Sequence, residues 1–401
     1  MKFAHMADCH VGSWRDPRLK ELSIEAFTKS INICMEKKVD FIIIAGDLFN
    51  NALPGIDNLK VVVREFKRLQ ESDIPVYVIP GSHDYSPSGK TMIDVLDEAG
   101  FLTNVFKGKA IDNKLFLEFT ADKKTGVKLT GVLGRRGTLE KNYYEALDIE
   151  NLEMETGEKI FLFHSAIAEM MPKEFALIDS MPVSMMPKGF EYYAGGHIHI
   201  VKHESFKNHK NVVYPGPLFP ASFSELEKLS NGGFYIYDDG KLTREELNLK
   251  NTFFIDIDAN HKTPEEVYNY VIDKIEKKEF INTIILIRAH GTLKTGKVSD
   301  VKFNELSDKM YSKGAFFVMK NTSRLSSEDF EEIRIDHDNI DNVEDVLIKE
   351  HLQQLNLFDK EKEYNLIKDL MKTLSAEKHE GEKVHEYDDR IRKETDKVLD
   401  V

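Results

Sequence analysis

The chain has 401 residues, with 55 basic and 69 acidic side chains and a formal net charge of −14. This length predicts two or three domains, and no apolar run is long enough to cross a bilayer, so we expect no membrane partner. Its two cysteines exclude a disulfide framework, and no signal peptide precedes the first candidate site residue, Asp8, so a cytoplasmic protein is expected.

Residues 1–105 alternate between strand and helix patterns. The expected strands are Lys2–Ala7, Lys38–Ala45 and Pro75–Pro80, and the expected helices are Asp16–Lys37, Leu59–Gln70 and Met92–Ala99. The run Phe41–Ile44 is apolar throughout, which is typical of a central strand that is covered on both faces. This strand–helix rhythm predicts a largely parallel sheet.

Residues 106–250 are richer in strand patterns than in helix patterns. The expected strands are Leu115–Phe119, Lys128–Leu133, Ile160–His164, Gly189–Ala194, Asn211–Tyr214 and Phe234–Tyr237. A second sheet packed on the first accounts for these strands. We therefore predict an α/β fold over residues 1–250, built as a four-layer α/β/β/α sandwich.

Two further parts follow this sandwich. Residues 251–335 show the pattern strand, helix, strand, helix, strand, which predicts a small α+β cap domain. Residues 341–376 have helical periodicity with two apolar faces, which predicts a helical hairpin that either binds a partner or docks on its own protein. Residues 377–401 are highly charged, and this tail is expected to be disordered or to fold on binding.

Five short stretches carry an Asp or a His where an apolar run ends. They are Asp8–His10, Gly46–Phe49, Gly81–Asp84, Phe163–His164 and Gly195–His199. Because strand ends converge on one crevice in an open α/β sheet, these side chains can meet in space. Their carboxylates and imidazoles form a ligand set suited to divalent transition metals. Two such ions close together are typical of enzymes that cleave phosphate esters.

Each stretch also has an ordinary structural interpretation when it is taken alone. Asp8 and His10 project to one side of a strand end and can grip one ion. Asp47 follows a buried strand and could bridge two ions or simply cap a turn. His83, next to Asp84, could donate to a phosphoryl oxygen or be a loop histidine. The order and spacing of all five stretches favour the metal interpretation.

The ordered set of stretches resembles the signature of the calcineurin-like binuclear metallophosphoesterases. Within that superfamily the chain is similar to the archaeal double-strand-break repair nucleases of the meiotic-recombination type, relatives of bacterial SbcD. The segments that carry this similarity are Lys2–Gly12, Gly46–Phe49, Gly195–His199 and Tyr214–Pro217. Over residues 1–250 the similarity lies in motifs, and in the cap and hairpin it lies in architecture.

The resemblance implies a centre of two manganese ions per chain. The first ion would be held by Asp8, His10, Asp47 and His199, and the second by Asp47, His164, His197 and Ser82. Ser82 stands where the family usually has Asn, so its contact with the second ion would be direct or through water. Asn50 similarly replaces a His that is found in many members. His83 would contact the scissile phosphate, and Asp84 would orient it.

The same resemblance implies an activity and partners. The implied activity is 3′-to-5′ exonuclease on duplex DNA ends plus endonuclease on single-stranded DNA, in double-strand-break processing at the nucleoid. One implied partner is an ABC-type ATPase with a long coiled coil, bound through residues 341–376. The other is a second copy of the chain, bound through helices around Leu59–Val63 and Met92–Ala99.

Two other functions fit the same ligand residues. A phosphatase or cyclic-nucleotide phosphodiesterase would use the same ions, and the acidic net charge favours a substrate other than nucleic acid. A non-catalytic scaffold would result if the site had decayed, with Ser82 as the first loss. The basic residues that could line a DNA path, or form an ordinary solvated face, are Lys20, Arg64, Lys67, Arg68, Arg135 and Arg136.

Overall fold

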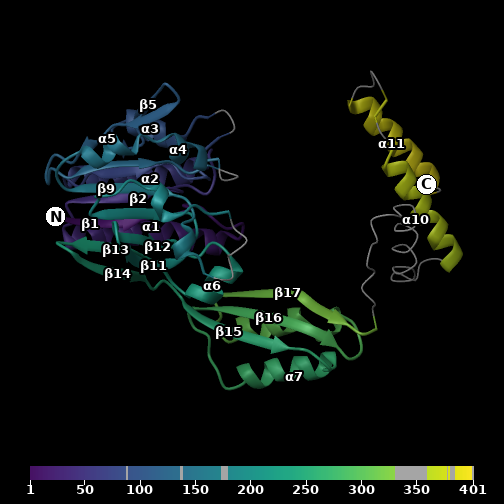
Figure 1. Ribbon diagram of the computed structural model, residues 1–401. Coiled ribbons are helices and arrows are strands. Elements are labelled where there is room, and N and C mark those ends of the chain that lie inside the picture. The colour runs from purple at the N-terminus through teal and green to yellow at the C-terminus, as the bar shows by residue number, and fades with distance from the viewer. Residues whose placement is uncertain are drawn as a thin grey trace. The chain divides into compact units, whose positions relative to one another are not determined.

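The computed structural model describes residues 1–86, 89–135, 139–172, 179–329, 359–376, 378–379 and 384–399. The chain divides into two compact units, Met1–Asp329 and Phe330–Val401. The first unit holds two six-stranded sheets and, after them in sequence, a smaller three-stranded sheet (Figure 1). None of the helices in the described ranges has the length and apolar character that a membrane crossing requires.

The first sheet is built mainly from the N-terminal third of the chain. Its strand order is β14 (Lys241–Leu247), β13 (Gly232–Asp238), β1 (Lys2–Met6), β2 (Phe41–Ala45), β3 (Val76–Ile79) and β4 (Thr103–Asn104). Strands β1 to β4 are parallel, and β13 pairs antiparallel with β1. The parallel pairing confirms the predicted strand–helix rhythm and brings the carboxyl ends of β1, β2 and β3 to one edge.

The second sheet takes its strands from the middle of the chain. Its order is β11 (Val201–Phe206), β12 (His209–Pro215), β10 (Tyr192–Gly196), β9 (Lys159–His164), β8 (Lys128–Val132) and β7 (Thr120–Ala121). Strands β12, β10, β9 and β8 are parallel, and the two edge strands are antiparallel to their neighbours.

Aromatic side chains fill the space between the two sheets. Phe3 of β1 stacks on Phe41 with 5.1 Å between ring centroids, and it meets Tyr192 of β10 edge-on at 5.0 Å. These side chains belong to one apolar cluster that takes residues from both sheets. Because helices cover the other side of each sheet, the central strands are apolar on both faces.

The helices complete the predicted four-layer sandwich. α1 (Pro17–Lys37), α2 (Ile56–Glu71) and α3 (Met92–Glu98) pack on the first sheet, and α4 (Lys141–Ala146) and α5 (Ile149–Met154) pack on the second. Short 3-10 helices occur at Ala168–Met170, Val183–Met185 and Val298–Val301. α1 begins after Asp16, whose side chain accepts from the Arg18 N–H, and ends at Lys38 in the left-handed conformation.

One expected strand of the second sheet lies elsewhere. Sequence patterns place Leu115–Phe119 in that sheet, but β6 (Lys114–Leu117) pairs with β5 (Gly108–Ile111) in a separate hairpin. The two-residue turn between β5 and β6, at Asp112 and Asn113, has φ values of 51° and 62°. Two left-handed residues are what a tight hairpin turn requires, so this local pairing wins over pairing with the second sheet.

A second expected strand changes sheets. Phe234–Tyr237 lies in β13, which pairs with β1 at the edge of the first sheet rather than joining the second. Its side chains alternate between the inter-sheet cluster, which takes Tyr237, and the cluster under α1, which takes Phe234 and Ile236. This alternation suits either sheet, so the sequence pattern alone does not select the partner strand.

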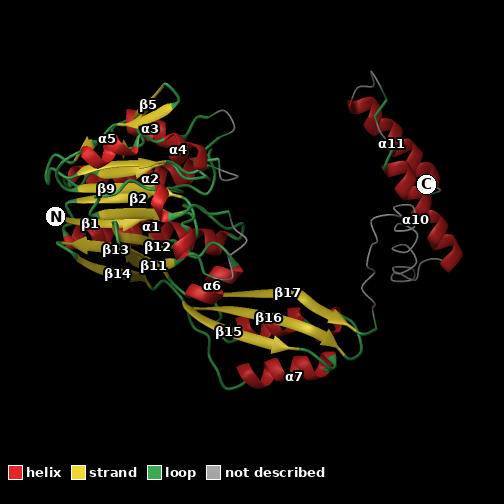
Figure 2. Cartoon of the chain, viewed as in Figure 1, coloured by secondary structure: helices red, strands yellow, loops and turns green. Residues whose placement is uncertain are grey.

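Residues 251–329 form a parallel three-stranded sheet, in the strand and helix order predicted for the cap. The strands are β15 (Asn251–Asp258), β16 (Thr283–Leu293) and β17 (Phe317–Ser327), connected by α7 (Pro264–Ile275) and α8 (Phe303–Ser312). Figure 2 shows α7 along one face of this sheet. On the other face, Ile284 and Leu286 join the apolar cluster that contains α1 and α2.

Within its described residues the C-terminal unit contains two helices, α10 (Lys360–Leu374) and α11 (Val384–Val398), which lie side by side. α10 coincides with the second arm of the predicted hairpin, whereas the first arm falls in residues 341–358, outside the described residues. α11 lies in the stretch 377–401, where the sequence pattern predicts a disordered or conditionally folded tail. Most of this charged stretch is therefore helical.

Candidate functional site

The five predicted stretches converge at one edge of the two stacked sheets. β1, β2 and β3 of the first sheet lead into Asp8, Asp47 and His83. β9 of the second sheet ends at His164, and β10 leads into His197. Side chains far apart in sequence thus come into contact: the Nε2 atoms of His10 and His199, 189 residues apart in the chain, lie 3.0 Å from each other.

Five of the predicted site residues have the left-handed backbone conformation that non-glycine residues rarely adopt. The φ angle is 49° at Asp8, 42° at His10, 53° at Asp47, 101° at His197 and 48° at His199. Such conformations cost on the order of 1–3 kcal/mol each and cluster at functional sites. The chain therefore turns sharply after β1, β2 and β10, and these turns carry the five side chains into one space.

Backbone contacts hold these strained turns together. The Asp8 N–H donates to the Gly46 carbonyl at 3.1 Å, and the His197 N–H donates to both Asp8 carboxylate oxygens at 2.9 and 3.1 Å. Gly46 has a φ of 87°, and a Cβ there would lie 2.1 Å from Nδ1 of His164. Only glycine lets the end of β2 pass this close to the His164 ring.

Asp47 lies at the centre of the cluster and is 2% exposed. Its Oδ2 atom is 3.2 Å from Nε2 of His164 and 3.8 Å from Nε2 of His10. Its Oδ1 atom accepts from the His83 N–H at 2.7 Å, and the Ser82 hydroxyl donates to Oδ2 at 3.4 Å. One carboxylate thus faces histidines from both sheets, which is the arrangement that a bridging metal ligand requires.

The His164 ring is held in one tautomer. Its Nδ1–H donates to the Ala45 carbonyl at 2.8 Å, because a carbonyl oxygen can only accept. In the neutral ring Nε2 then carries the lone pair, and this buried atom lies 3.2 Å from Oδ2 of Asp47. A lone pair and a carboxylate this close repel each other unless a proton or a cation lies between them, so Nε2 of His164 fits a metal ligand.

His10 and His199 approach each other through their Nε2 atoms, which are 3.0 Å apart. Nδ1 of His199 lies 3.1 Å from the Oε2 atom of Glu225, and this carboxylate keeps the proton on Nδ1. Nε2 of His199 then points toward Asp8, at 3.6 Å from Oδ1. Imidazole and carboxylate lone pairs directed to one point suit a shared cation.

Glu225 is a site residue that sequence patterns do not single out. It lies in α6 (Phe223–Leu229), whose N-cap residue Ser222 accepts from the Glu225 N–H at 3.2 Å. The Glu225 carboxylate also accepts from the Ala221 N–H at 2.9 Å. The spacing Ser-x-x-Glu predicts the start of a helix, but the contact with His199 depends on tertiary structure.

Among the residues that the structure describes, three overlapping groups of side chains could hold metal ions, each with ligand atoms within 4.8 Å of one another. They are Asp8, His10 and His199; Asp8, Asp47 and His164; and His10, Asp47 and His83. Ser82 and His197 lie beside these groups, and the His197 ring centroid is 5.1 Å from that of His164. Two carboxylates shared among several imidazoles fit a dinuclear centre for first-row transition ions.

Burial and charge act in opposite directions on the histidines. Burial lowers the pKa of His10 to about 3 and that of His197 to about 4. Burial also opposes the charge on His164 and His199, but the carboxylates of Asp47 and Asp8 outweigh it and raise these pKa values to about 10 and about 9. Protons on two histidines thus balance the buried carboxylates, so cation binding must release protons.

Asp84 acts on the backbone of the loops rather than on the His83 ring. Its carboxylate accepts at 2.9, 3.0 and 3.2 Å from the N–H groups of Gly81, Phe49 and Leu48. Nδ1–H of His83 donates to the Asn50 carbonyl at 2.9 Å, while Asp84 ties the loops after β2 and β3 together. The orienting role of Asp84 stays a prediction.

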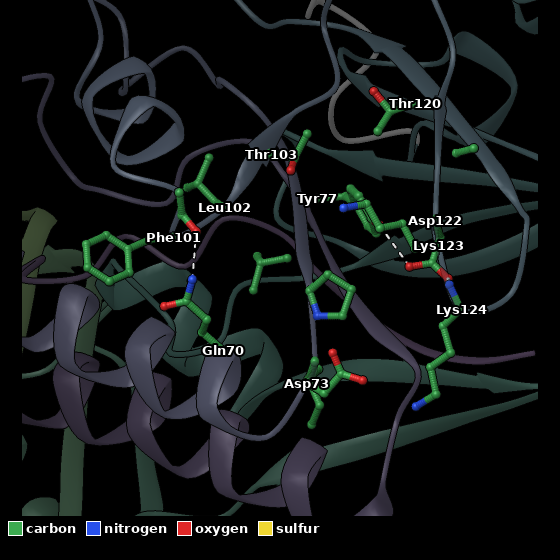
Figure 3. A pocket seen from close by; sticks show the side chains of 15 residues that line it. Gln70, Asp73, Tyr77, Phe101, Leu102, Thr103, Thr120, Asp122, Lys123 and Lys124 are labelled. Carbon is green, nitrogen blue, oxygen red and sulfur yellow. Dashed lines mark hydrogen bonds between the residues drawn. The ribbon is translucent and has the colours of Figure 1, made fainter.

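A hollow of about 600 Å³ lies at the other end of β3 (Figure 3). It is lined by Asp73–Tyr77, at the start of the strand, whereas His83 follows the end of the strand. The Tyr77 hydroxyl donates to Asp122 at 2.8 Å, a contact between two lining residues that Figure 3 draws as a dashed line. None of the predicted site residues lines the hollow, so it is distinct from the cluster of predicted metal ligands.

The sequence profile of a family described as calcineurin-like phosphoesterase matches residues 1–201, which include every predicted ligand from Asp8 to His199. A DNA double-strand break repair protein Mre11 from Methanococcus maripaludis is 29% identical over 70% of this chain and 71% of its own length. The protein of the same name from Archaeoglobus fulgidus is 26% identical over 69% of this chain and 64% of its own.

Among solved structures, a dimetal phosphatase from Danio rerio is 9% identical to this chain. The superposition covers 61% of this chain and 95% of the phosphatase, with a TM-score of 0.38. This likeness is too distant to carry an argument.

We expect Asp47→Ala to weaken the binding of both metal ions, because the Asp47 carboxylate faces His10 and His164 at once. The loss of affinity should exceed the roughly 10- to 100-fold change typical of outer-shell substitutions. Calorimetric titration of chelator-treated protein with Mn²⁺ measures both the number of ions and their affinity. Asp57→Ala removes an exposed carboxylate from α2 and should leave both values unchanged. Wild-type binding by Asp47→Ala would rule out a bridging role.

Proposed function

This chain belongs to the calcineurin-like phosphoesterase family, and we propose that it is a manganese-dependent DNA nuclease that processes double-strand breaks. The main observation behind this proposal is the extent of the sequence similarity. The alignments with the two repair proteins cover 70% and 69% of the chain, whereas the match to the phosphoesterase family ends at residue 201. The similarity thus continues into the part of the chain after the sandwich. A small phosphate ester needs no such addition, so a polymeric substrate is favoured, and DNA as substrate implies work at the nucleoid in the cytoplasm.

We assign the ligands of two manganese ions to the residues of the sequence motifs. The first set is Asp8, His10, Asp47 and His199, and the second is Asp47, His164 and His197, with Ser82 completing it directly or through water. The position of Asp47 between His10 and His164 supports its place in both sets. When bound, the two ions supply a hydroxide nucleophile and neutralise charge on the phosphoryl oxygens.

His83 is the residue that we assign to the scissile phosphate. Its Nδ1–H donates to the Asn50 carbonyl, which fixes the ring and leaves Nε2 for the substrate. The ring centroid lies 4.8 Å from that of His10, so His83 borders the metal groups. A protonated Nε2 can donate to a phosphoryl oxygen and then protonate the leaving alkoxide. Asp84 supports this position by holding the backbone on both sides of the loop.

Among the basic residues that could contact DNA, Arg135 has the most suitable surroundings. Its guanidinium lies over the rings of Tyr85 and Tyr143, at 5.3 and 5.9 Å from their centroids, and Tyr85 is two residues after His83. A cation among aromatic rings near the site suits both phosphates and unstacked bases. Three other candidates fit less well, because Arg64, Lys67 and Arg68 pair with acidic residues of α2. Arg136 lies outside the described residues.

We expect His83→Gln to lose Mn²⁺-dependent cleavage of end-labelled DNA by about 100-fold or more, the usual contribution of a general acid. The variant should still bind two ions, because glutamine keeps the backbone N–H that donates to Asp47. Linear duplex and single-stranded substrates together measure the exonuclease and endonuclease activities. Mn²⁺ titration of the same samples separates lost chemistry from a lost metal centre.

The matched control is His203→Gln on β11, which changes an exposed histidine that contacts Asn211. This variant should cleave DNA at the wild-type rate. If the wild type degrades no DNA but turns over a phosphomonoester or a cyclic nucleotide, the phosphatase or phosphodiesterase alternative replaces the nuclease. If the wild type binds two ions but turns over neither class of substrate, the result supports the non-catalytic scaffold.

We also propose that the C-terminal unit binds an ABC-type ATPase with a long coiled coil. On α10 the apolar side chains Met371 and Leu374 are 39% and 59% exposed. The neighbouring helix α11 contacts the end of α10, where the Tyr387 hydroxyl donates to the Ala376 carbonyl at 3.1 Å. The helix pair thus leaves an apolar strip open, and a coiled coil offers a complementary apolar seam.

We expect Leu374→Glu to weaken binding to the ATPase about tenfold or more, because burying a leucine contributes about 1.5–3 kcal/mol. Surface plasmon resonance between the two full-length proteins measures the change. Lys372→Glu, at an exposed position of the same helix, adds the same side chain away from the strip and should have a much smaller effect. DNA cleavage by the isolated chain should not change. Equal affinities for Leu374→Glu and the wild type would exclude this strip as the docking site.

A second copy of the chain is the other partner that we propose. Ile56 at the start of α2 and Val95 on α3 are 84% and 57% exposed, and Leu59, Val63 and Met92 are only partly buried on the same two helices. Apolar side chains at the exposed side of two helices suit an isologous contact, in which each copy covers the same patch of the other.

We expect Val95→Glu to shift the chain toward monomers, because a carboxylate would be buried without a partner in such a contact. Light scattering over a range of protein concentrations measures the change in mass. Met154→Glu alters a side chain on α5 that is 81% exposed, away from the proposed contact, and should leave the mass unchanged. A monomeric wild type, or an unchanged mass for Val95→Glu, would remove this interface.

A further inference from the structure

The short helix α6 has two opposite faces, and each makes a contact that matters for the site. Glu225 and Glu227 are two positions apart in this helix, so their side chains leave it in nearly opposite directions. Glu225 meets His199 of the metal cluster, and Glu227 meets Arg288 of β16 in the three-stranded sheet. Leu226 between them is fully buried and anchors the helix in the apolar cluster of α1 and α2.

The face toward the metal cluster is fixed by several bonds to one carboxylate. Oε2 of Glu225 lies 3.1 Å from Nδ1 of His199 and accepts from the Ala221 N–H at 2.9 Å. Oε1 accepts from the Ser222 hydroxyl at 3.0 Å. The Glu225 carboxylate therefore cannot rotate independently of the helix start, and the position of α6 sets the orientation of the His199 ring.

On the opposite face the helix is held by Arg288. Arg288 donates from Nε to Oε1 of Glu227 at 2.8 Å and from Nη2 to Oε2 at 2.5 Å. Its guanidinium also lies over the Phe223 ring, 5.0 Å from the centroid. Phe223 and Glu227 are four residues apart and share one side of the helix, so Arg288 grips that side at two points. The two-point fork depends on the planar guanidinium.

This pair is not an ordinary surface ion pair. The side chains of Arg288 and Glu227 are 21% and 20% exposed, so solvent screens their contact only in part. A second contact between the three-stranded sheet and the sandwich lies at Arg18, whose guanidinium is 4.6 Å from the centroid of the Phe317 ring. That contact involves α1 and β17 and does not touch α6. The contact of Arg288 with α6 can therefore be removed while the contact at Arg18 stays in place.

We propose that Arg288 and Glu227 are positioning residues of the metal centre, which hold α6 so that Glu225 orients His199. The inference rests on the proposed function, because it assumes that His199 binds one of the two ions. In this arrangement a ligand that pulls β16 away from α6 loosens one metal ligand without touching the cluster. The three-stranded sheet thus affects the orientation of His199 through α6, without contacting the reacting phosphate.

The test is Mn²⁺ affinity, measured by calorimetry and by the electron paramagnetic resonance signal of free Mn²⁺, without DNA. Arg288→Ala and Glu227→Gln should each weaken one of the two ions, by up to about tenfold, since they act one step beyond an outer-shell ligand. The other ion should keep its wild-type affinity. Arg288→Lys, which keeps the charge but loses the fork, should fall between Arg288→Ala and the wild type.

A charge swap and a matched control distinguish an effect that passes through α6 from a general loosening of the three-stranded sheet. Arg288→Glu combined with Glu227→Arg should recover part of the affinity that either single change loses. Arg18→Ala removes a contact of the sheet that does not touch α6 and should bind both ions as the wild type does. The proposal is overturned if Arg288→Ala and Glu227→Gln bind both ions with wild-type affinity, or if Arg18→Ala weakens the same ion equally.

Two further readouts keep the outcome clear. If Arg288→Ala does not fold, Glu227→Gln decides, because it leaves the three-stranded sheet unchanged. In the metal-free protein, the nitrogen-15 shift of the His199 ring should move in Glu227→Gln, since its bond to Glu225 is altered, and an unmoved shift counts against the proposal. A wild type that binds two ions but cuts no DNA rejects the proposed nuclease, and the affinities of the variants still decide the role of α6.

Discussion

Two buried carboxylates, those of Asp8 and Asp47, impose the main constraint on this structure. They are 1% and 2% exposed, and their ion-pair partners within the described ranges are histidines alone. Removing a carboxylate from water costs several kcal/mol even after relaxation. Histidines can offset this cost in two ways: they can carry protons, or they can share cations with the carboxylates. Stacking the two sheets brings enough histidines together, because each sheet supplies some of the imidazoles that surround the two carboxylates.

The same constraint explains where the backbone is strained. At five of the predicted ligand positions the backbone is left-handed, a conformation that costs free energy. Packing between the two sheets offsets this cost, because a core of aromatic and branched side chains fixes the strands before these turns. The crowding is visible at Gly81, where a Cβ would lie 2.2 Å from Oδ1 of Asp47. Strain and close packing therefore coincide at the residues whose chemistry needs exact placement.

Much of this arrangement can be predicted from sequence, and the failures have physical causes. The four layers and the strand-end positions of Asp8, Asp47 and His164 follow from apolar runs that end in ligand-type residues. The hairpin at Lys114–Leu117 and the change of sheet by Phe234–Tyr237 could not be predicted, because alternation does not specify a partner strand. Glu225 was missed for a related reason: its capping pattern predicts a helix start, and nothing local reveals the histidine that it meets.

The net charge of −14 must also be reconciled with the DNA substrate that we propose. Repulsion between remote charges is screened beyond about 8–10 Å at physiological ionic strength, whereas contacts in a buried site are screened much less. An acidic surface thus slows encounter with DNA but leaves short-range contacts at Arg135 and at the metal centre intact. Capture would then depend on surfaces outside the centre, such as the three-stranded sheet or a partner. If that sheet is the first part to meet DNA, its grip on α6 would couple capture to the orientation of His199.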